Sequence, residues 1–255
     1  MKILAVTPCS LDVINDGTKL RASTTIAALR RQHNVELVHF DSRFAPAARS
    51  FSRVGRLFSL DAALLRRFRN AEFAALLAEK AKEADLCYLI SLQMGQYQPH
   101  LPNDLPCVLD NYNVESDILA NLARQRPWFT RWFWLLEAYK LKRAEARILK
   151  TVDACVAISE EDATTFQKMA PTTRVSTIPP ALDLLPYTEL NAPPQPGTMV
   201  FIGALDWHVN DDAATWMARE VMPRILNRYP DARLQIVGKN PGERLRGLAN
   251  PSIEV

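Results

Sequence analysis

Short apolar runs alternate with amphipathic helical patterns from the N-terminus of this chain to Pro180. The apolar runs predict strands at residues 3–6, 35–40, 86–90, 107–109, 154–158 and 175–178. Between the first two strands, Ala22, Ile26 and Leu29 recur at helical spacing and define one apolar helix face. Further helices are expected at residues 61–82, 116–124, 130–150 and 160–169. Strands and helices that alternate at this spacing favour an α/β fold with a parallel, doubly wound sheet.

Proline interrupts this alternation at Pro179–Pro180 and again at residues 192–197. Because proline ends helices and central strands, we expect a Rossmann-like N-terminal domain at residues 1–183 and a linker at 184–198. The alternation restarts at residues 199–255, where we expect a second Rossmann-like domain. Its predicted elements are strands at 199–202, 233–237 and 252–255, and a helix at 211–227 that Pro223 kinks or interrupts. Three strands and two helices make a thin core, so this second domain is expected to be incomplete.

Composition excludes several classes of protein. A net charge of +3 over 255 residues is too small to indicate nucleic-acid binding by itself. No apolar run reaches the ~18–20 residues that cross a bilayer. The four cysteines are scattered without a CxxC pair, which favours buried structural thiols and a reducing cytoplasm. The sequence has no P-loop, G-x-S-x-G or G-x-G-x-x-G motif, which disfavours ATPases, hydrolases and dinucleotide oxidoreductases, and no metal site is expected.

Four segments resemble those of one enzyme family, and they occur in that family's order. FIGALDWHVN at residues 201–210, followed by Pro223 and LQIVG at 234–238, resembles the start of the family's C-terminal domain. DNYNVES at 110–116, VAISEED at 156–162 and IPPALD at 178–183 are similar to three segments of its N-terminal domain. The family is that of the retaining, family-4 (group 1) glycosyltransferases. The resemblance covers essentially the whole chain.

The resemblance implies a GT-B architecture, in which two Rossmann-like domains bind acceptor and donor. It implies transfer of a sugar from a nucleotide diphosphate sugar, with retention of anomeric configuration and with no cofactor or catalytic metal. The acceptor it implies is a glycan or lipid-linked intermediate of polysaccharide or cell-envelope synthesis. Cytoplasmic localisation is expected, and contact with the inner face of the cytoplasmic membrane is left open.

The family also carries an E-x7-E motif in its donor domain, whose glutamates hold the donor. After Phe201 this chain has Glu220, Glu243 and Glu254, which do not have that spacing. We therefore expect an acceptor domain joined to the front third of a donor domain, truncated and inactive by itself.

The first turn, PCSLDVINDGT at residues 8–18, leaves the first strand and enters a helix. The N–H groups at a helix N-terminus attract anions, so a phosphate of donor or acceptor could bind near Gly17 and Arg21. Relatives often have two glycines in this loop, whereas this chain has Asp16 and Gly17, and the Asp16 carboxylate would repel a phosphate. The alternative is a tight turn in which Gly17 supplies a positive φ.

In DNYNVES, Tyr112 replaces the histidine that lies in the family's reaction cleft. Tyrosine can donate a hydrogen bond but does not exchange protons near neutral pH. We interpret Tyr112 as the catalytic-site residue that positions the donor sugar; the alternative is a site that has decayed. Asn113 and Glu115 are acceptor-side candidates, or simply part of a strand-to-helix connection near a helix N-cap.

The loop after Phe201 is the candidate donor site, with Gly203, Asp206 and Asn210 as its predicted residues. Many relatives carry Arg and Lys at the positions of Ala204 and Asn210, where they hold the diphosphate; a subset carries the W-x-x-N form found here. That substitution leaves the diphosphate charge to backbone N–H groups. The neighbouring aspartates, at 211 and 212, also fit a plain helix start.

Two basic, aromatic stretches are candidates for contact with anionic lipid. Residues 43–69 hold seven arginines and one acidic residue, interleaved with phenylalanine and leucine. RQRPWFTRWFW at residues 124–134 holds three tryptophans. The alternative is that the aromatic residues pack in the core while the arginines face solvent. No nucleic-acid motif supports RNA as the partner.

A different class of function is consistent with the same residues. The chain could be a non-enzymatic acceptor-binding or interaction protein whose partial second domain docks on a partner chain. A weaker alternative is another Rossmann-like binding protein, with nucleotide at the first turn. The sugar, the nucleotide base and the oligomeric state are left open by the sequence.

Overall fold

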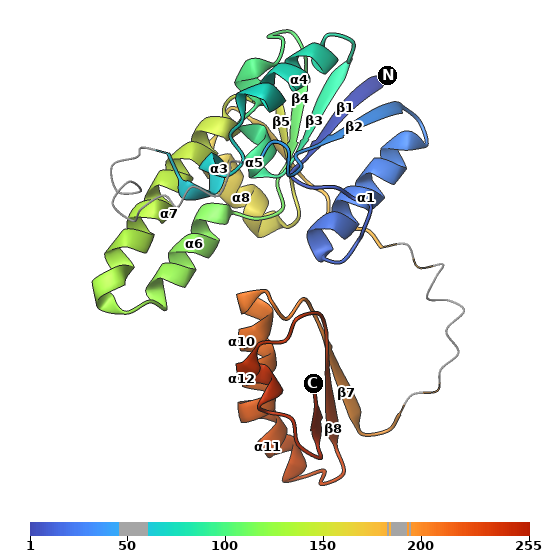
Figure 1. Ribbon diagram of the computed structural model, residues 1–255, viewed down its shortest axis with the longest axis vertical. Helices are drawn as coiled ribbons and strands as arrows, with labels where there is room; N and C mark the ends of the chain where they lie inside the picture. The colour runs from blue at the N-terminus through green and yellow to red at the C-terminus, as the bar shows by residue number, and fades with distance from the viewer. Residues whose placement is uncertain (46–60, 183, 185–192, 194) are drawn as a thin grey trace. The chain divides into compact units, whose positions relative to one another are not determined.

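The computed structural model describes residues 1–45, 61–182, 184, 193 and 195–255. The chain divides into two compact units, Met1–Asp183 and Leu184–Val255, each with its own sheet (Figure 1).

The first unit is built on a six-stranded parallel sheet with the order β2-β1-β3-β4-β5-β6. The strands are β1 (Lys2–Thr7), β2 (Asn34–His39), β3 (Leu86–Ile90), β4 (Cys107–Asp110), β5 (Ala154–Ala157) and β6 (Arg174–Thr177). All six predicted strands are confirmed to within about one residue at each end. The strand order reverses between β1 and β3, so the loops after these strands diverge at that point, where α/β proteins characteristically bind ligands.

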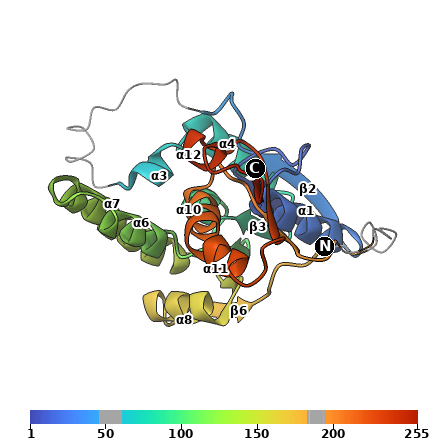
Figure 2. The same cartoon turned by 90° about the horizontal axis from the view of Figure 1, so that it is seen from below.

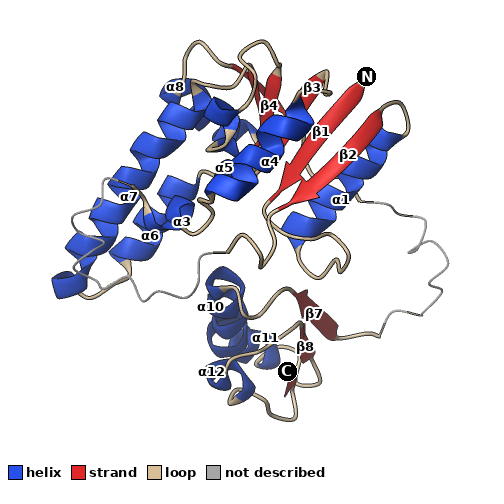
Figure 3. Cartoon of the chain, turned by 45° about the horizontal axis from the view of Figure 1, so that its top comes forward, coloured by secondary structure: helices blue, strands red, loops and turns tan. Residues whose placement is uncertain are grey.

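Helices cover both faces of this sheet (Figure 3). They are α1 (Gly17–Arg30), α3 (Ala63–Arg66), α4 (Ala71–Ala81), α5 (Leu92–Gly95), η1 (Gln98–His100), α6 (Glu115–Arg124), α7 (Trp128–Leu149) and α8 (Glu160–Met169). Because side chains alternate along a strand, Ile3 and Ala5 of β1 pack with Ile26 of α1, whereas Leu4 and Val6 join the core of the opposite face. That opposite core includes residues of α4, α5, α7 and α8.

The helix expected at residues 61–82 is wrong as a single element, because the chain forms α3 and α4 with a break between them. Asn70 adopts an extended conformation there, and its side-chain oxygen accepts a hydrogen bond from the Phe73 N–H at 3.0 Å. An N-cap of this kind begins a new helix and interrupts the previous one. The sequence analysis also missed α5 and η1, which are too short to show a periodic pattern.

The basic, aromatic stretch at residues 43–69 is only partly described, since residues 46–60 lie outside the described ranges. Phe44, Leu65 and Phe68 pack in the core of the first unit, and Arg43 and Arg69 form ion pairs with nearby aspartates. The predicted lipid-contact residues Phe51, Leu57, Phe58 and Leu60 fall outside the described residues.

In the tryptophan-rich stretch, residues 124–134, two of the three tryptophans lie on the surface. The helices α6 and α7 form an antiparallel pair whose connecting turn lies away from the sheet of the same unit (Figures 1 and 2). Trp128 and Trp132 are exposed on α7. The alternative that the tryptophans pack together in the core is therefore wrong for these two residues.

The second unit has a three-stranded parallel sheet with the order β7-β8-β9. Its elements are β7 (Thr198–Ile202), α10 (His208–Trp216), the π-helical turn Met217–Val221, α11 (Met222–Leu226), β8 (Arg233–Val237), α12 (Glu243–Arg246) and β9 (Ile253–Glu254). β7 is an edge strand of this sheet. Its Met199 and Phe201 pack against the core of the unit, whereas Val200 and Ile202 point the other way and are exposed.

Pro223 follows the π-helical turn within the predicted helix. The Met222 N–H bonds to the Met217 carbonyl, five residues back. In a regular α-helix the Pro223 ring would collide with the carbonyl four residues before it. The wider turn relieves this clash, so the helix continues past proline with its regular bonding interrupted, as the sequence indicated.

Candidate active site

A pocket of about 280 Å³ lies in the first unit at the carboxyl end of β4. Its walls are the first turns of α1 and the segments that follow β4, β5 and β6. The lining residues are Gly17, Thr18, Leu20, Arg21, Tyr112, Asn113, Ile158, Pro180 and Ala181. Residues so far apart in sequence meet because the carboxyl ends of parallel strands share one edge of the sheet. Four predicted site residues, Gly17, Arg21, Tyr112 and Asn113, therefore line one pocket.

Arg21 is buried and connects three parts of the unit. Its Nη2 donates to Asp110 Oδ1 at 2.8 Å, and its Nη1 donates to the Ile178 carbonyl oxygen at 2.9 Å. The guanidinium carbon lies 5.3 Å from the centroid of the Tyr112 ring, a cation–π distance. Arg21 thus joins α1 to β4 and to the segment after β6, and it orients Tyr112.

Asp110 supplies the opposite charge inside this network. Its second oxygen accepts a hydrogen bond from the Tyr88 hydroxyl at 3.0 Å, so both carboxylate oxygens are bonded. Burial raises the pKa of Asp110, and the hydrogen bonds from Arg21 and Tyr88 offset part of that rise. The buried arginine is therefore matched by a buried carboxylate.

Tyr112 has a hydroxyl group with no hydrogen-bond partner among the described residues. The side chain is only 6% exposed and lines the pocket. Burial raises the pKa of Tyr112, so the hydroxyl keeps its proton at neutral pH. Leaving a buried hydroxyl unpaired destabilises a fold by about 1–3 kcal/mol, and a ligand oxygen in the pocket would accept its hydrogen bond.

Glu115 lies at the start of α6 and does not line the pocket. It accepts a hydrogen bond from Asn113, while burial raises the pKa of Glu115. The N-cap position of α6 is Val114, which offers no side-chain acceptor. Glu115 thus lies next to the N-cap of α6, which is the position that the structural alternative gave it.

The helix α6 is instead capped from another helix, by Glu145 of α7. The Glu145 carboxylate accepts hydrogen bonds from the Glu115 N–H at 3.2 Å and from the Ser116 hydroxyl at 2.7 Å. Burial raises the pKa of Glu145 to about 7. The sequence analysis missed this residue, although its place among Leu141, Ala144, Ile148 and Leu149 on the buried face of α7 was a usable signal.

Asp16 and Gly17 begin α1. The Asp16 side chain accepts a hydrogen bond from the Lys19 N–H at 2.9 Å and is the N-cap. Its carboxylate therefore already occupies part of the site where a phosphate would approach the helix. The alternative that Gly17 supplies a positive φ is wrong: among the described glycines only Gly197 has one, at 75°. A Cβ at Gly17 would meet no atom within 4 Å, so the space beside it is open.

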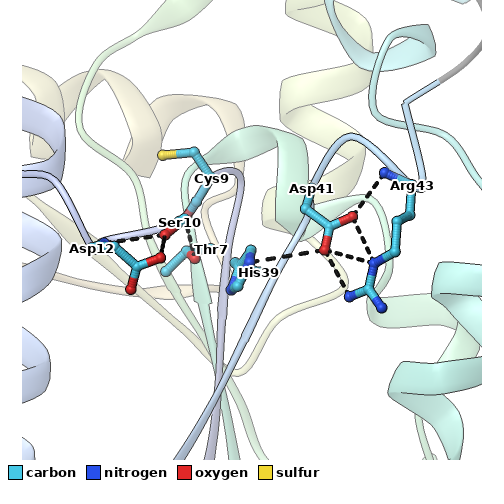
Figure 4. Close-up of polar contacts among 7 residues, drawn as sticks. All are labelled: Thr7, Cys9, Ser10, Asp12, His39, Asp41 and Arg43. Carbon is cyan, nitrogen blue, oxygen red and sulfur yellow. Dashed lines mark hydrogen bonds and ion pairs between the residues drawn. The ribbon is translucent and has the colours of Figure 1, made fainter.

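The turn after β1 is held by its own polar groups (Figure 4). The Thr7 hydroxyl donates to the Cys9 carbonyl at 2.8 Å, and Ser10 bonds to the Asp12 carboxylate. Beyond the neighbouring strand β2, Asp41 pairs with Arg43 at 2.7 Å, and that hydrogen bond lowers the pKa of Asp41. Asp41 is thus directed at Arg43, whereas the Asp12 carboxylate lies in the turn itself and does not favour an anion there.

In the second unit, Gly203 and Asp206 lie in the loop between β7 and α10, and Asn210 lies in the first turn of α10. Asn210 Nδ2 donates to the Ala204 carbonyl at 3.1 Å and packs against Gly203. Asp206 accepts a hydrogen bond from Asn240 Nδ2 at 3.2 Å. The three predicted donor residues thus lie at the β7–α10 junction, where side-chain hydrogen bonds from Asn210 and Asn240 stabilise the loop.

Two residues of interest were missed by the sequence analysis. Lys239 follows β8 and lies 3.9 Å from the Asp206 carboxylate, which places a cation at the glycine loop. Its position after Gly238, at the carboxyl end of the strand next to β7, was the signal that could have found it. Ser91 follows β3 with a φ of 76° and a buried hydroxyl unpaired among the described residues. Such backbone strain clusters at functional sites, and nothing in the sequence marks it.

The neighbouring aspartates at 211 and 212 have a structural role. Asp211 lies in the first turn of α10, and both carboxylates pair with Arg244, the second at 2.7 Å. Within the described ranges, no group of three or more His, Cys, Asp and Glu side chains is placed to hold a metal ion. None of the described helices is long and apolar enough to span a bilayer.

No family model matches the sequence, and no curated protein matches it either. Several solved structures do match the fold. A sucrose-phosphate synthase from Thermosynechococcus elongatus matches 99% of this chain and 69% of its own, at 13% identity and a TM-score of 0.63.

Two further matches contain UDP. An alpha-glucosyltransferase in complex with UDP and a 13-mer DNA matches 97% of this chain and 59% of its own, at 11% identity and a TM-score of 0.52. The S. aureus MnaA–UDP structure matches 100% of this chain and 68% of its own, at 11% identity and a TM-score of 0.50. At such identities these matches show the fold, which is the Rossmann-like α/β architecture of the GT-B type. The predicted fold class is confirmed.

Proposed function

We propose that the protein is a glycosyltransferase that uses a nucleotide diphosphate sugar, in the manner of the retaining family-4 enzymes. The GT-B fold supports this proposal, together with the four family-like segments in their expected order. The observation that carries it is the first-unit pocket, where the unpaired Tyr112 hydroxyl lies beside Gly17 and Asn113 at the carboxyl edge of the sheet.

In this proposal the first unit binds the acceptor. Tyr112 is the catalytic-site residue and donates a hydrogen bond to a sugar oxygen, because its raised pKa keeps the proton in place. Arg21 positions Tyr112 through the cation–π contact, and Asp16 positions α1 as its N-cap. Asn113 lines the pocket and holds Glu115 by a hydrogen bond.

In this proposal the second unit binds the nucleotide sugar donor. The Gly203 loop offers backbone N–H groups, Asn210 and Asp206 stabilise the loop, and Lys239 supplies a cation for the diphosphate. Because two of the matching structures contain UDP, UDP-sugars are the first donors to test. Transfer rests on electrostatic stabilisation of the departing diphosphate and on orientation of the acceptor, with no catalytic metal or cofactor.

The acceptor in this proposal is a glycan or a lipid-linked intermediate of polysaccharide or cell-envelope synthesis, reached at the inner face of the cytoplasmic membrane. Exposed tryptophans on the first unit support a membrane-proximal acceptor.

A second candidate is a non-enzymatic interaction protein. It is favoured by the edge strand β7, where Val200 and Ile202 are exposed. An exposed apolar edge strand can pair with a strand of a partner chain. A stable complex that forms without any nucleotide-sugar turnover would support this candidate.

The test is nucleoside diphosphate release from UDP-, GDP- and ADP-sugars by the protein expressed in full from its gene, with a lipid or glycan extract as acceptor. We expect release from one nucleotide class, and a fall in kcat of about tenfold or more for Tyr112→Phe. Thermal stability should not fall in this variant, since the hydroxyl makes no hydrogen bond.

Tyr229→Phe is the matched control, because Tyr229 is exposed on the second unit. It should keep the parent kcat. A folded protein that neither binds nor turns over any of these nucleotide sugars would overturn the proposal.

A further inference from the structure

Four exposed side chains form a stripe along α7. Trp128, Trp132, Leu135 and Tyr139 follow one another at intervals of four, three and four residues, which places them on one face of the helix. They are 82%, 55%, 42% and 59% exposed. We call them the α7 stripe.

The stripe has no role in the described core. The other side of α7 carries the buried residues Leu141, Ala144 and Ile148, which belong to the main core of the first unit. Two large indole rings on the surface are a patch that a soluble monomer rarely leaves uncovered.

The charged residues at the start of α7 and in the turn before it are all basic. Arg124, Arg126 and Arg131 are exposed, and residues 118–136 contain no aspartate or glutamate. The Arg126 guanidinium carbon lies 5.1 Å from the Trp134 ring centroid. Farther along α7, the exposed Lys142 and Arg143 continue the same side of the helix, and Arg143 lies over the Tyr139 ring at 5.9 Å.

The two acidic side chains of α7 are buried and do not belong to the exposed stripe. Glu137 and Glu145 are both buried, and each accepts hydrogen bonds from the start of another helix. The stripe and its arginines are therefore not neutralised by carboxylates of α7.

We propose that the α7 stripe, with Arg124, Arg126 and Arg131, binds the surface of a bilayer that contains anionic lipids. Tryptophan and tyrosine are favoured at the headgroup level, where an aromatic ring is half in hydrocarbon and half in water. Arginines beside them pair with lipid phosphates. The turn between α6 and α7 lies away from the sheet of the same unit, and α7 begins with Trp128 just after this turn (Figures 1 and 2).

A bilayer fits these observations better than a protein partner. The patch combines exposed aromatic rings on one helix face with exposed basic residues at 124, 126, 131, 142 and 143, which is complementary to an anionic surface. This inference concerns the surface of α7 and does not depend on the chemistry of the pocket.

The test is flotation of the 255-residue chain with vesicles of phosphatidylcholine alone or mixed with phosphatidylglycerol. We expect binding to the mixed vesicles at low salt, weaker binding at high salt, and a blue shift of tryptophan emission on binding. Arg126→Gln should lower the partition coefficient about fivefold, and Trp128→Ala with Trp132→Ala should lower it by more than about tenfold.

The matched control is Trp216→Ala, since Trp216 is 60% exposed on the second unit. It should bind the mixed vesicles as the parent chain does. Circular dichroism of each variant separates loss of binding from loss of folding.

Three results would overturn the inference. The first is equal flotation of the parent chain and the folded Trp128→Ala, Trp132→Ala variant, and the second is no flotation on anionic vesicles at low salt. The third is a dimer in solution that these two substitutions dissociate, which would assign the stripe to a second copy of the chain.

Discussion

Arg21 shows how one residue can define a site without being its reactive group. All three of its guanidinium nitrogens are bonded, two to Asp110 and one to the Ile178 carbonyl, so the group is fixed in place by the protein itself. The same guanidinium packs on Tyr112, whose hydroxyl is unpaired. Arg21, which the sequence placed at the first turn as a candidate neighbour of a bound phosphate, therefore contacts Asp110 and positions Tyr112.

Replacing Arg21 by methionine should destabilise the first unit by roughly 3–5 kcal/mol, because it leaves the Asp110 carboxylate buried without its cation. Urea unfolding measures this change. The double variant Arg21→Met, Asp110→Asn should regain a large part of the loss, since neither charge is then buried. A single Arg21→Met variant as stable as the parent chain would contradict the assignment.

At the scale of the elements, α7 supplies caps for two other helices. The Glu137 carboxylate accepts a hydrogen bond from the Ala63 N–H at 2.9 Å, at the start of α3, and Glu145 caps α6. Neither α3 nor α6 has a side-chain cap of its own. A carboxylate at a helix N-terminus also interacts favourably with the helix dipole, so α7 orients both helices toward the core.

Glu145 should make stability depend on pH in an unusual direction. Burial raises its pKa from 4.5 to about 7 in the folded state, so between these values the folded chain holds a proton that the unfolded chain has lost. Stability linked to this group therefore falls as the pH rises from about 4.5 to about 7, and levels off above that. Urea midpoints of the parent and Glu145→Gln should differ in slope across this window. Identical slopes would refute the assignment.

The contact between β7 and β8 sets a second test at this scale. A Cβ at Gly238 would lie 1.8 Å from the Gly203 carbonyl oxygen, so the two strand ends approach too closely for any side chain. Gly238→Ala should destabilise the second unit by more than about 2 kcal/mol and displace the Gly203 loop. Gly242→Ala is the control, because its nearest contact would be 3.9 Å away. Amide hydrogen exchange in β7 and β8 reports the difference, and equal exchange in both variants would be evidence against it.

The sequence predicted the strands well because buried parallel strands are continuous apolar runs. It also marked Gly17, Arg21, Tyr112 and Asn113 as separate candidates, and the structure shows that these four residues line one pocket at the carboxyl ends of the strands. The sequence carried a signal for the position of Glu145 on α7 and of Lys239 after β8, but none for their partners, which are distant in sequence and depend on how helices and strands pack. The split of the 61–82 helix depended on Asn70, a single residue whose capping role a periodic pattern hides.

At the scale of the whole molecule, the chain has two units with separate cores. In the proposed function, the first unit binds the acceptor and the second binds the donor. The first unit has a pocket with a free hydroxyl, and the second has a glycine loop with a lysine beside it. The GT-B fold joins two such Rossmann-like parts in one chain, and the match to the sucrose-phosphate synthase covers 99% of the residues in both units.

The most direct measurement of the central claim is transfer of an isotope-labelled sugar from a nucleotide diphosphate sugar to an extracted lipid or glycan fraction. The protein is expressed in full from its gene, and mass spectrometry and NMR identify the product. We predict a labelled product whose new glycosidic bond keeps the donor's anomeric configuration, and a lower yield with Tyr112→Phe. Label that stays on the nucleotide with every donor and fraction, while the protein is folded, would contradict the account.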